Sequence, residues 1–406
     1  MRIGRCAKGM LIEIFAGAPI IGRIPVSNSP SNFESRPTMK FETIPIPTER
    51  QPDGWRPPAD IRMISADDHN MEMEHLWEER LPARFKARAP RLWHDKASGW
   101  HMEINGRLFD VPGDAGQLSE SMSGMWDLDA RLRAMDAEHI EASVLFHGKL
   151  QTLNALIADD KELYMACIDV YNEWLAEFTG RVPGRLIGVA VLPTFLQPEA
   201  SLDYLHKLME LGYKAVQIPS YPRGVRYNSL AMEPLWSAFE ECNLPLSFHV
   251  GAVIEFAGHG SLGANIARNL CPFRPLLGQL MFSGVYERHP GLKTIFTEGG
   301  AGWVADALYG MDKICREYQS VLKPKLGELP SVYWKRQCYA TFMDDPVAMR
   351  LIDLIGEDNV MWSLDFPHAE GVHGYAGKVA KSIYDTIGHD RAKKVLGGNA
   401  ARVWGI

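Results

Sequence analysis

Asp67 and His69 have the residue types and the spacing to bind a metal ion. They lie in the stretch Ser65-Ala66-Asp67-Asp68-His69, and the two-residue period of a strand places both side chains on one face. A carboxylate and an imidazole that project side by side can bind one divalent cation. By itself the Asp-x-His pattern occurs at close to chance frequency, and a turn followed by an ordinary surface histidine is the commoner case. The metal interpretation therefore depends on residues further along the chain.

Three more candidates stand at the ends of later apolar segments. His249, Glu298 and Asp365 each end or closely follow such a segment. A lone histidine at a strand end is more commonly a hydrogen-bonded core residue, and a lone aspartate commonly caps the loop or helix that follows. In a parallel barrel, however, the carboxyl ends of the strands meet on one face, where the active site lies. We therefore expect His249 and Asp365 to join Asp67 and His69 in one metal site if the strands form a barrel, with Glu298 on the same face.

Apolar strands alternate with amphipathic helices through most of the chain. Near-continuous apolar strands between helices predict a parallel sheet covered by helices. Eight such strand–helix units favour an α/β fold of the (β/α)8 TIM-barrel type over an open sheet. A doubly wound dinucleotide fold would need G-x-G-x-x-G after its first strand, and the sequence has no such pattern there. The expected strands are 63–66, 142–146, 186–192, 215–219, 244–249, 292–297, 339–342 and 360–363.

A β-hairpin is predicted as an insertion after the first strand. Residues 91–94 and 100–104 flank Lys96-Ala97-Ser98-Gly99, a pattern typical of a hairpin. We expect this insertion to act as a lid over the active site.

Composition limits the partners and the compartment. The chain has 406 residues, of which 46% are hydrophobic and 23% charged, as in a globular protein with a large core. A net charge of −7 leaves no basic surplus for phosphates, so no nucleic-acid partner is expected. No apolar run reaches the roughly 18 residues that span a membrane, so no membrane partner is expected. The six scattered cysteines fit a reducing cytoplasm.

The first part of the chain differs in character from the rest. Residues 1–60 are expected to be a proline-rich, disordered N-terminal extension without a catalytic role, and residues 61–406 to form the barrel. The basic residues Arg2, Arg5 and Lys8 precede an apolar run at 10–21, which faintly resembles a signal peptide. Export is therefore the alternative to a cytoplasmic location.

Four motifs follow one another along the chain: Asp67-x-His69-x-x-Glu72, Ser247-Phe248-His249, Thr297-Glu298-Gly299-Gly300 and Asp365-Phe366-Pro367-His368-x-Glu370. In this order they resemble the amidohydrolase-related family, in the branch that contains aminocarboxymuconate-semialdehyde decarboxylase and the resorcylate-type decarboxylases. The resemblance covers roughly residues 61–404 and implies a (β/α)8 barrel with one divalent metal ion. The implied metal ligands are Asp67, His69, His249 and Asp365.

The resemblance also implies roles for the other motif residues. Asp365, His249 and Glu298 are implied as catalytic, while Glu72, His368 and Glu370 are implied to contact the substrate or support the ligands. Glu298 departs from the family, because many relatives have a histidine at this strand end. Its carboxylate could be a base, an additional oxygen ligand or an acceptor for the backbone amides of the glycine-rich turn.

The expected function is metal-dependent catalysis on a small molecule. Two imidazoles and two carboxylates suit Zn²⁺ best, with Mn²⁺ as the second candidate. Non-oxidative decarboxylation of an aromatic or unsaturated carboxylic acid is favoured by the resemblance. Hydrolysis of an ester, amide, lactone or C–C bond is the alternative, and a catalytically inactive barrel used for binding is a remote third. A homodimer is compatible with this interpretation.

Overall fold

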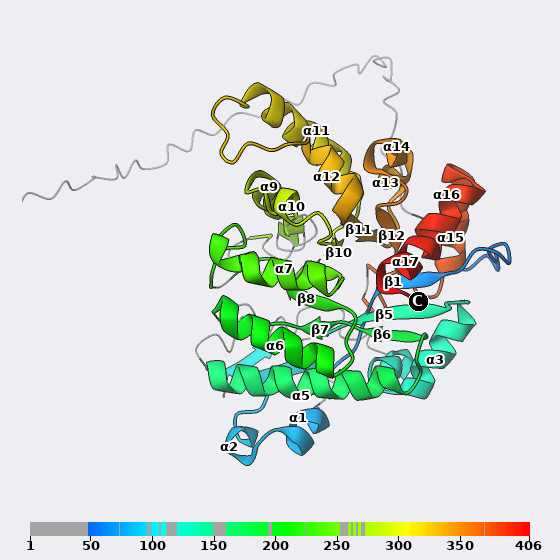
Figure 1. Ribbon diagram of the computed structural model, residues 1–406. Coiled ribbons are helices and arrows are strands. Elements are labelled where there is room, and N and C mark those ends of the chain that lie inside the picture. Colours follow the sequence, from blue (N-terminus) through cyan, green and yellow to red (C-terminus); the bar gives the residue numbers. More distant parts are fainter. Residues whose placement is uncertain are drawn as a thin grey trace, which may run out of the picture. The chain divides into compact units, whose positions relative to one another are not determined.

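The computed structural model describes residues 48–406, except 73, 96–98, 105–106, 111–119, 149–159, 194–196, 223, 252–258, 261–262, 265–266, 269–272 and 369. Strands and helices alternate along the described chain (Figure 1). The parallel strands are β1 (Ile64–His69), β5 (Ala142–Phe146), β6 (Leu186–Gly188), β7 (Ala190–Val191), β8 (Val216–Pro219), β9 (Leu246–His249), β10 (Thr294–Thr297), β11 (Cys338–Phe342) and β12 (Val360–Trp362).

Helices follow the strands and cover their outer side. They are α1 (Glu74–Arg80), α2 (Ala83–Lys86), α3 (Leu128–Ala137), α5 (Lys161–Gly180), α6 (Pro198–Glu210), α7 (Glu233–Glu241), α9 (Phe273–Phe282), α10 (Val285–Arg288), α11 (Gly302–Glu317), α12 (Pro330–Gln337), α13 (Pro346–Arg350), α14 (Ile352–Ile355), α15 (Ala376–Ile387), α16 (His389–Lys393) and α17 (Asn399–Trp404). Helix α12 was not predicted from the sequence. Among the described residues, no helix is long and apolar enough to cross a membrane.

The predicted strand 186–192 is interrupted at Val189, which divides it into β6 and β7. These two strands belong to different hydrogen-bonded ladders. The order of one ladder is β1-β5-β6, and that of the other is β7-β8-β9-β10-β11-β12. Between β6 and β7, the amide of Val189 donates to the carbonyl of Leu145 (2.9 Å), and the amide of Ala190 donates to that of Ala215 (3.0 Å). Together β6 and β7 therefore serve as one strand, and the described chain supplies the eight strands of a (β/α)8 barrel.

Hydrogen bonds between β1 and the segment after β12 close the barrel. The amide of Asp365 donates to the carbonyl of Asp67 (2.8 Å), and the amide of His69 donates to the carbonyl of Phe366 (2.8 Å). The hydroxyl of Ser65 accepts from the amide of Leu364 (2.8 Å). Closure therefore brings the first and last motifs of the sequence side by side.

The barrel interior is a packed apolar core at its amino-terminal end. Alternate strand residues such as Ile64, Val144 and Ile295 fill it, as the two-residue period requires. Helix α17 contributes Ala400, Val403 and Trp404 to the same core. The polar side chains are thereby confined to the opposite, carboxyl end of the strands.

A second, larger core lies between the strands and the helices. Helix α5 shows why it forms: Asp160 caps its start by accepting from the amide of Leu163 (3.1 Å), and the apolar side chains recur at helical spacing. Its buried residues include Tyr164, Cys167, Ile168 and Tyr171. Full burial of side chains of this size stabilises a fold by roughly 1.5–3 kcal/mol each.

A three-stranded antiparallel sheet follows α2. It consists of β2 (Arg91–Asp95), β3 (Gly99–Ile104) and β4 (Arg107–Asp110), in the order β2-β3-β4. The third strand was not predicted from the sequence. The predicted hairpin turn includes residues 96–98, which lie outside the described residues, and the lid role stays a prediction.

Residues 48–60 contact the barrel. The backbone amide of Thr48 donates to the carboxylate of Asp344 (2.5 Å), just after β11. Further along, the Trp55 ring lies 5.9 Å from that of Tyr384 in α15. Residues 1–47 lie outside the described residues.

Candidate metal centre

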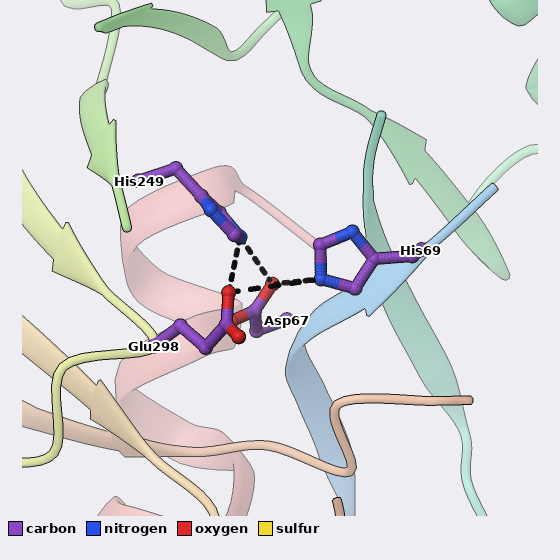
Figure 2. A group of neighbouring side chains, drawn as sticks. All are labelled: Asp67, His69, His249 and Glu298. Carbon is purple, nitrogen blue, oxygen red and sulfur yellow. Dashed lines mark hydrogen bonds and ion pairs between the residues drawn. The ribbon is translucent and has the colours of Figure 1, made fainter. Parts of the chain in front are cut away.

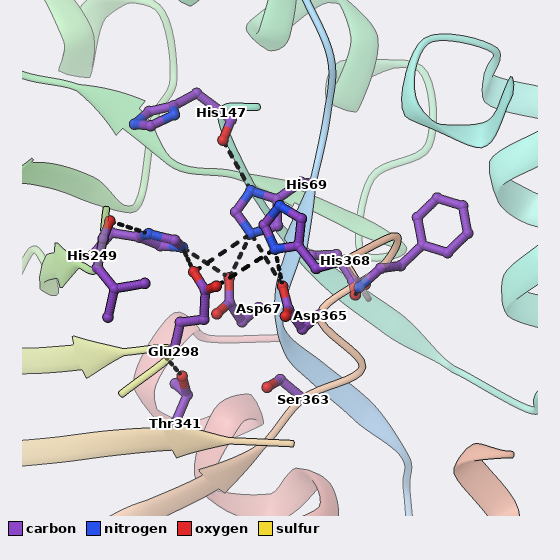
Figure 3. Close-up of polar contacts among 12 residues, drawn as sticks. Asp67, His69, His147, His249, Glu298, Thr341, Ser363, Asp365 and His368 are labelled. Carbon is purple, nitrogen blue, oxygen red and sulfur yellow. Dashed lines mark hydrogen bonds and ion pairs between the residues drawn. The ribbon is translucent and has the colours of Figure 1, made fainter. Parts of the chain in front are cut away.

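Six titratable side chains meet at the carboxyl end of the barrel. Strand β1 supplies Asp67 and His69, β9 supplies His249, and Glu298 follows β10. The segment after β12 supplies the last two, Asp365 and His368. All are buried except the His368 side chain, which is 32% exposed. The Asp67, His69, His249 and Glu298 side chains come together around one point in Figure 2, and Figure 3 adds the remaining two.

The two buried imidazoles are oriented by backbone carbonyls. Nδ1 of His69 lies 2.9 Å from the carbonyl oxygen of His147, and Nδ1 of His249 lies 3.0 Å from that of Val250. Because a carbonyl only accepts, each Nδ1 carries a hydrogen, and each Nε2 faces the centre, where a neutral ring presents its lone pair. This is the arrangement that fixes a histidine as a metal ligand.

The distances between donor atoms fit a shared cation. His249 Nε2 lies 3.1 Å from Glu298 Oε2 and 3.4 Å from Asp67 Oδ1. His69 Nε2 lies 3.3 Å from Asp365 Oδ1, 3.7 Å from Asp67 Oδ1 and 3.9 Å from Glu298 Oε2. Ligand atoms about 2.1 Å from one ion lie roughly 3–3.4 Å apart. Glu298 and Asp67 both lie within this range of His249, and both lie slightly beyond it from His69.

Buried negative charge is the main electrostatic feature of the cluster. Among the described residues, the ion pairs of Asp67, Glu298 and Asp365 involve histidines alone, with no lysine or arginine. Burial raises the pKa of the Asp67 carboxyl well above its usual range, although His249 acts in the opposite direction. Three buried carboxyl groups that face only imidazoles favour positive charge, as the raised pKa of His249, about 9, also shows, and a divalent cation would supply it.

Unpartnered polar atoms support the same conclusion. Oδ2 of Asp67, Oδ2 of Asp365 and Nε2 of His69 are buried and have no hydrogen-bond partner within the described part of the chain. Burial lowers the pKa of His69 well below its usual value, so this imidazole is neutral. Donors of this kind fit a divalent metal ion, and the cluster is the candidate divalent-metal site of the described chain.

The backbone is left-handed at two of the carboxylates. Glu298 has φ of 71° and Asp365 has φ of 55°, a region that costs a residue with a side chain about 1–2 kcal/mol. The surroundings hold the Glu298 turn, because Thr341 Oγ1 accepts from its amide (2.8 Å). Asp345 Oδ2 accepts from the amides of Ala301 and Gly302 (2.9 Å each). Strain that is retained in this way is typical of functional sites.

Asp68 and Arg131 form a buried support that the sequence analysis did not identify. The Asp68 carboxylate accepts from the Ser143 hydroxyl and from the amide of Phe366 (2.9 Å), so it links β1 to β5 and to the segment after β12. Arg131 Nη1 lies 4.0 Å from Asp68, and Nη2 donates to the carbonyl of His69. Burial raises the pKa of Asp68 to about 6 and lowers that of Arg131 to about 10.

Two of the predicted site residues, Glu72 and Glu370, lie outside the group of donor atoms. Glu72 is buried, and its Oε1 accepts from the amide of Gly148 (3.1 Å). Glu370 is exposed in the loop after β12. His368, in contrast, lies within the cluster, where its Nδ1 is 2.8 Å from Asp365 Oδ1. The sequence alone placed His368 and Glu370 on equal terms, since only the fold shows which one turns inward.

A (β/α)8 barrel with buried acids and imidazoles at the carboxyl ends of its strands defines a class of enzyme with a metal-dependent active site. The chain belongs to the amidohydrolase family, because the sequence profile of that family, described as Amidohydrolase, matches residues 75–406. This match confirms the resemblance and the fold class that the motifs predicted.

Individual relatives are more distant. The chain is 24% identical over 324 residues to 2-amino-3-carboxymuconate-6-semialdehyde decarboxylase of Dictyostelium discoideum, covering 75% of this chain and 81% of the relative. An amidohydrolase structure from Mycobacterium avium subsp. paratuberculosis matches with a TM-score of 0.70 at 18% identity, covering 86% of this chain and 99% of that one.

A third match carries a metal ion. The structure of 5-carboxyvanillate decarboxylase from Novosphingobium aromaticivorans, in complex with manganese, has a TM-score of 0.59 at 20% identity. It covers 88% of this chain and 99% of that one. At these identities the two structures establish a shared fold.

Proposed function

We propose that this protein is a divalent-metal-dependent decarboxylase that releases CO2 without oxidation from an aromatic or unsaturated carboxylic acid. The observation that carries the proposal is the buried cluster of three carboxylates and two oriented imidazoles, with one further imidazole at its accessible edge. The decarboxylases among the matched proteins support the same reaction class. The ligands that we propose are Asp67, His69, His249, Asp365 and Glu298.

We propose Mn²⁺ as the resident ion, in place of the Zn²⁺ that the sequence favoured. Glu298 is the reason, because it belongs to both groups of donor atoms, and adding it to the four ligands that the sequence predicted gives three carboxylates and two imidazoles. Zn²⁺ prefers four ligands in a tetrahedron, whereas oxygen-rich sets with more donors suit Mn²⁺. The manganese bound to the matched 5-carboxyvanillate decarboxylase is consistent with this choice.

The chemistry divides between the ion and the protein. When bound, a divalent cation would act as a Lewis acid and would attract the substrate carboxylate to a site that is otherwise lined by carboxylates. The bond between the carboxylate and the adjacent carbon breaks, the electron pair stays on that carbon, and a proton must replace CO2 there. His368 can hold this proton, because its ring is partly exposed and its Nδ1 contacts Asp365.

A His368→Gln variant tests the assignment of the proton donor. Glutamine keeps a polar side chain of similar reach but cannot donate a proton as an acid, so we expect kcat to fall about 100-fold or more. Equilibrium Mn²⁺ affinity, measured by titration calorimetry, should stay within about tenfold, since His368 is not among the proposed ligands. Unchanged kcat would contradict the assignment.

The reaction class is tested with carboxyl-labelled substrates. The Mn²⁺-loaded enzyme is incubated with a panel of ¹³C-carboxyl-labelled hydroxybenzoates and unsaturated dicarboxylates in D2O. We expect labelled CO2 in the headspace and one deuterium on the carbon that carried the carboxyl group. Turnover of esters or lactones by the same preparation, with no labelled CO2 from any acid, would overturn decarboxylation in favour of hydrolysis.

A further inference from the structure

One peptide group links the buried Glu72 to the candidate metal site. The peptide between His147 and Gly148, just after β5, has its carbonyl oxygen 2.9 Å from Nδ1 of His69. The amide of the same peptide donates to Glu72 Oε1 at 3.1 Å. Because a peptide group is planar and rigid, a contact that holds its N–H also sets the direction of its carbonyl.

The surroundings leave this peptide little freedom to move. A Cβ atom on Gly148 would lie 2.3 Å from the carbonyl oxygen of Asn70 and 3.2 Å from Cα of Met71. The segments after β1 and β5 therefore approach each other as closely as a glycine allows. The amide of Asn70 also donates to the carbonyl of Phe146 (3.0 Å), and Glu72 itself is 3% exposed.

We propose that Glu72 is a positioning residue for the metal site, acting on His69 through the 147–148 peptide. The Glu72 carboxylate holds the peptide N–H, and the peptide carbonyl in turn holds the hydrogen on Nδ1 of His69. The imidazole then keeps a single tautomer whose Nε2 lone pair faces the other donors. Carboxylates that orient metal-binding histidines usually contact the ring directly. Here a peptide group lies between the two.

The link also has an electronic effect in the same direction. An amide that donates to a carboxylate polarises its own peptide, which makes the carbonyl oxygen a stronger acceptor. A stronger acceptor at Nδ1 raises the electron density at Nε2 of His69 and favours cation binding. The predicted effect on cation binding rests on the proposed function. The tautomer of His69, in contrast, is a property of the metal-free protein.

The tautomer is measured on metal-free protein labelled with ¹⁵N-histidine, by NMR. Nitrogen shifts separate a ring nitrogen that carries hydrogen from a bare one, and loss of a signal in His69→Gln assigns His69. We expect a single Nδ1–H form in the wild type and mixed tautomers in Glu72→Ala. Glu72→Gln, which keeps an oxygen acceptor for the Gly148 amide, should lie closer to the wild type. A wild-type tautomer in Glu72→Ala would overturn the proposal.

Metal affinity supplies the second readout. Titration with Mn²⁺ should show dissociation constants about tenfold higher, or more, for Glu72→Ala. Should that variant fail to fold, Glu72→Asp, which draws the carboxylate back from Gly148, gives the same comparison. The matched control is Glu240→Ala, because Glu240 accepts from the Gly291 amide (2.7 Å) ahead of β10, at the other end of the barrel. We expect its affinity to remain within twofold of the wild type.

The outcomes separate this proposal from the metal site itself. Equal losses of affinity in Glu72→Ala and Glu240→Ala would show general destabilisation and overturn the positioning role. A wild-type protein that binds no Mn²⁺ would refute the proposed function, while the NMR comparison would still decide whether Glu72 sets the tautomer of His69.

Discussion

His249→Ala and Asp365→Asn are each expected to abolish stoichiometric Mn²⁺ binding and to reduce turnover to the level of metal-free protein. His249 Nε2 is 3.1 Å and 3.4 Å from two of the carboxylate oxygens, so its loss removes a central donor. Asp365→Asn leaves the shape almost unchanged but removes one of the negative charges that favour a cation. Metal content after equilibrium dialysis is measured by inductively coupled plasma mass spectrometry, and folding by circular dichroism.

The control for these two variants is a histidine outside the cluster. His206 is exposed in α6, and His206→Ala should retain one Mn²⁺ per chain and wild-type turnover. Folded His249→Ala and Asp365→Asn proteins that both retain full metal occupancy would refute the ligand assignment.

Arg131→Met is expected to lower the free energy of unfolding by about 3–5 kcal/mol, because it leaves the buried Asp68 without its cationic partner. Arg131 is 1% exposed, and it also donates to the carbonyls of Gly124 and His69. Methionine retains most of the volume, so the loss reflects charge and hydrogen bonding rather than a cavity. Urea unfolding followed by fluorescence gives the free-energy difference.

Two further variants make the stability experiment specific. Arg80 pairs with Glu177 at the surface, where the side chains are 33% and 62% exposed, and Arg80→Met should change stability by at most about 1 kcal/mol. The double variant Asp68→Asn/Arg131→Met should recover part of the lost stability, since no unpaired charge remains. Equal effects of Arg131→Met and Arg80→Met would contradict the role of the buried pair.

Most of the fold was predictable because its signals are local. The apolar runs at β5 and β9 and the helical spacing in α5 specify their elements without reference to the rest of the chain. The interruption at Val189 was not predictable, because it depends on which neighbouring strands offer hydrogen bonds. Helix α12 was missed for a related reason: its residues Tyr333 and Trp334 bury their side chains against partners far away in sequence.

The candidate site divides in the same way. Strand ends indicated Asp67, His69, His249 and Asp365, and in the structure they fall into two overlapping groups of donor atoms. Asp67, His69 and His249 gather with Glu298, whereas Asp365 gathers with His69, Glu298 and His368. The position of the Glu298 carboxylate was not predictable, because it depends on a left-handed backbone turn and on a hydrogen bond to Thr341, which is distant in the sequence. The links from Glu72 to Gly148 and from Asp68 to Arg131 likewise exist only once β1, α3 and β5 have packed together.

The central claim is that the cluster binds one divalent cation, and anomalous diffraction tests it most directly. Crystals grown with Mn²⁺ would be measured on both sides of the manganese absorption edge. We predict one anomalous peak per chain, within bonding distance of Asp67, His69, His249, Glu298 and Asp365. A peak that contacts none of these residues, or no peak at saturating Mn²⁺, would contradict the account.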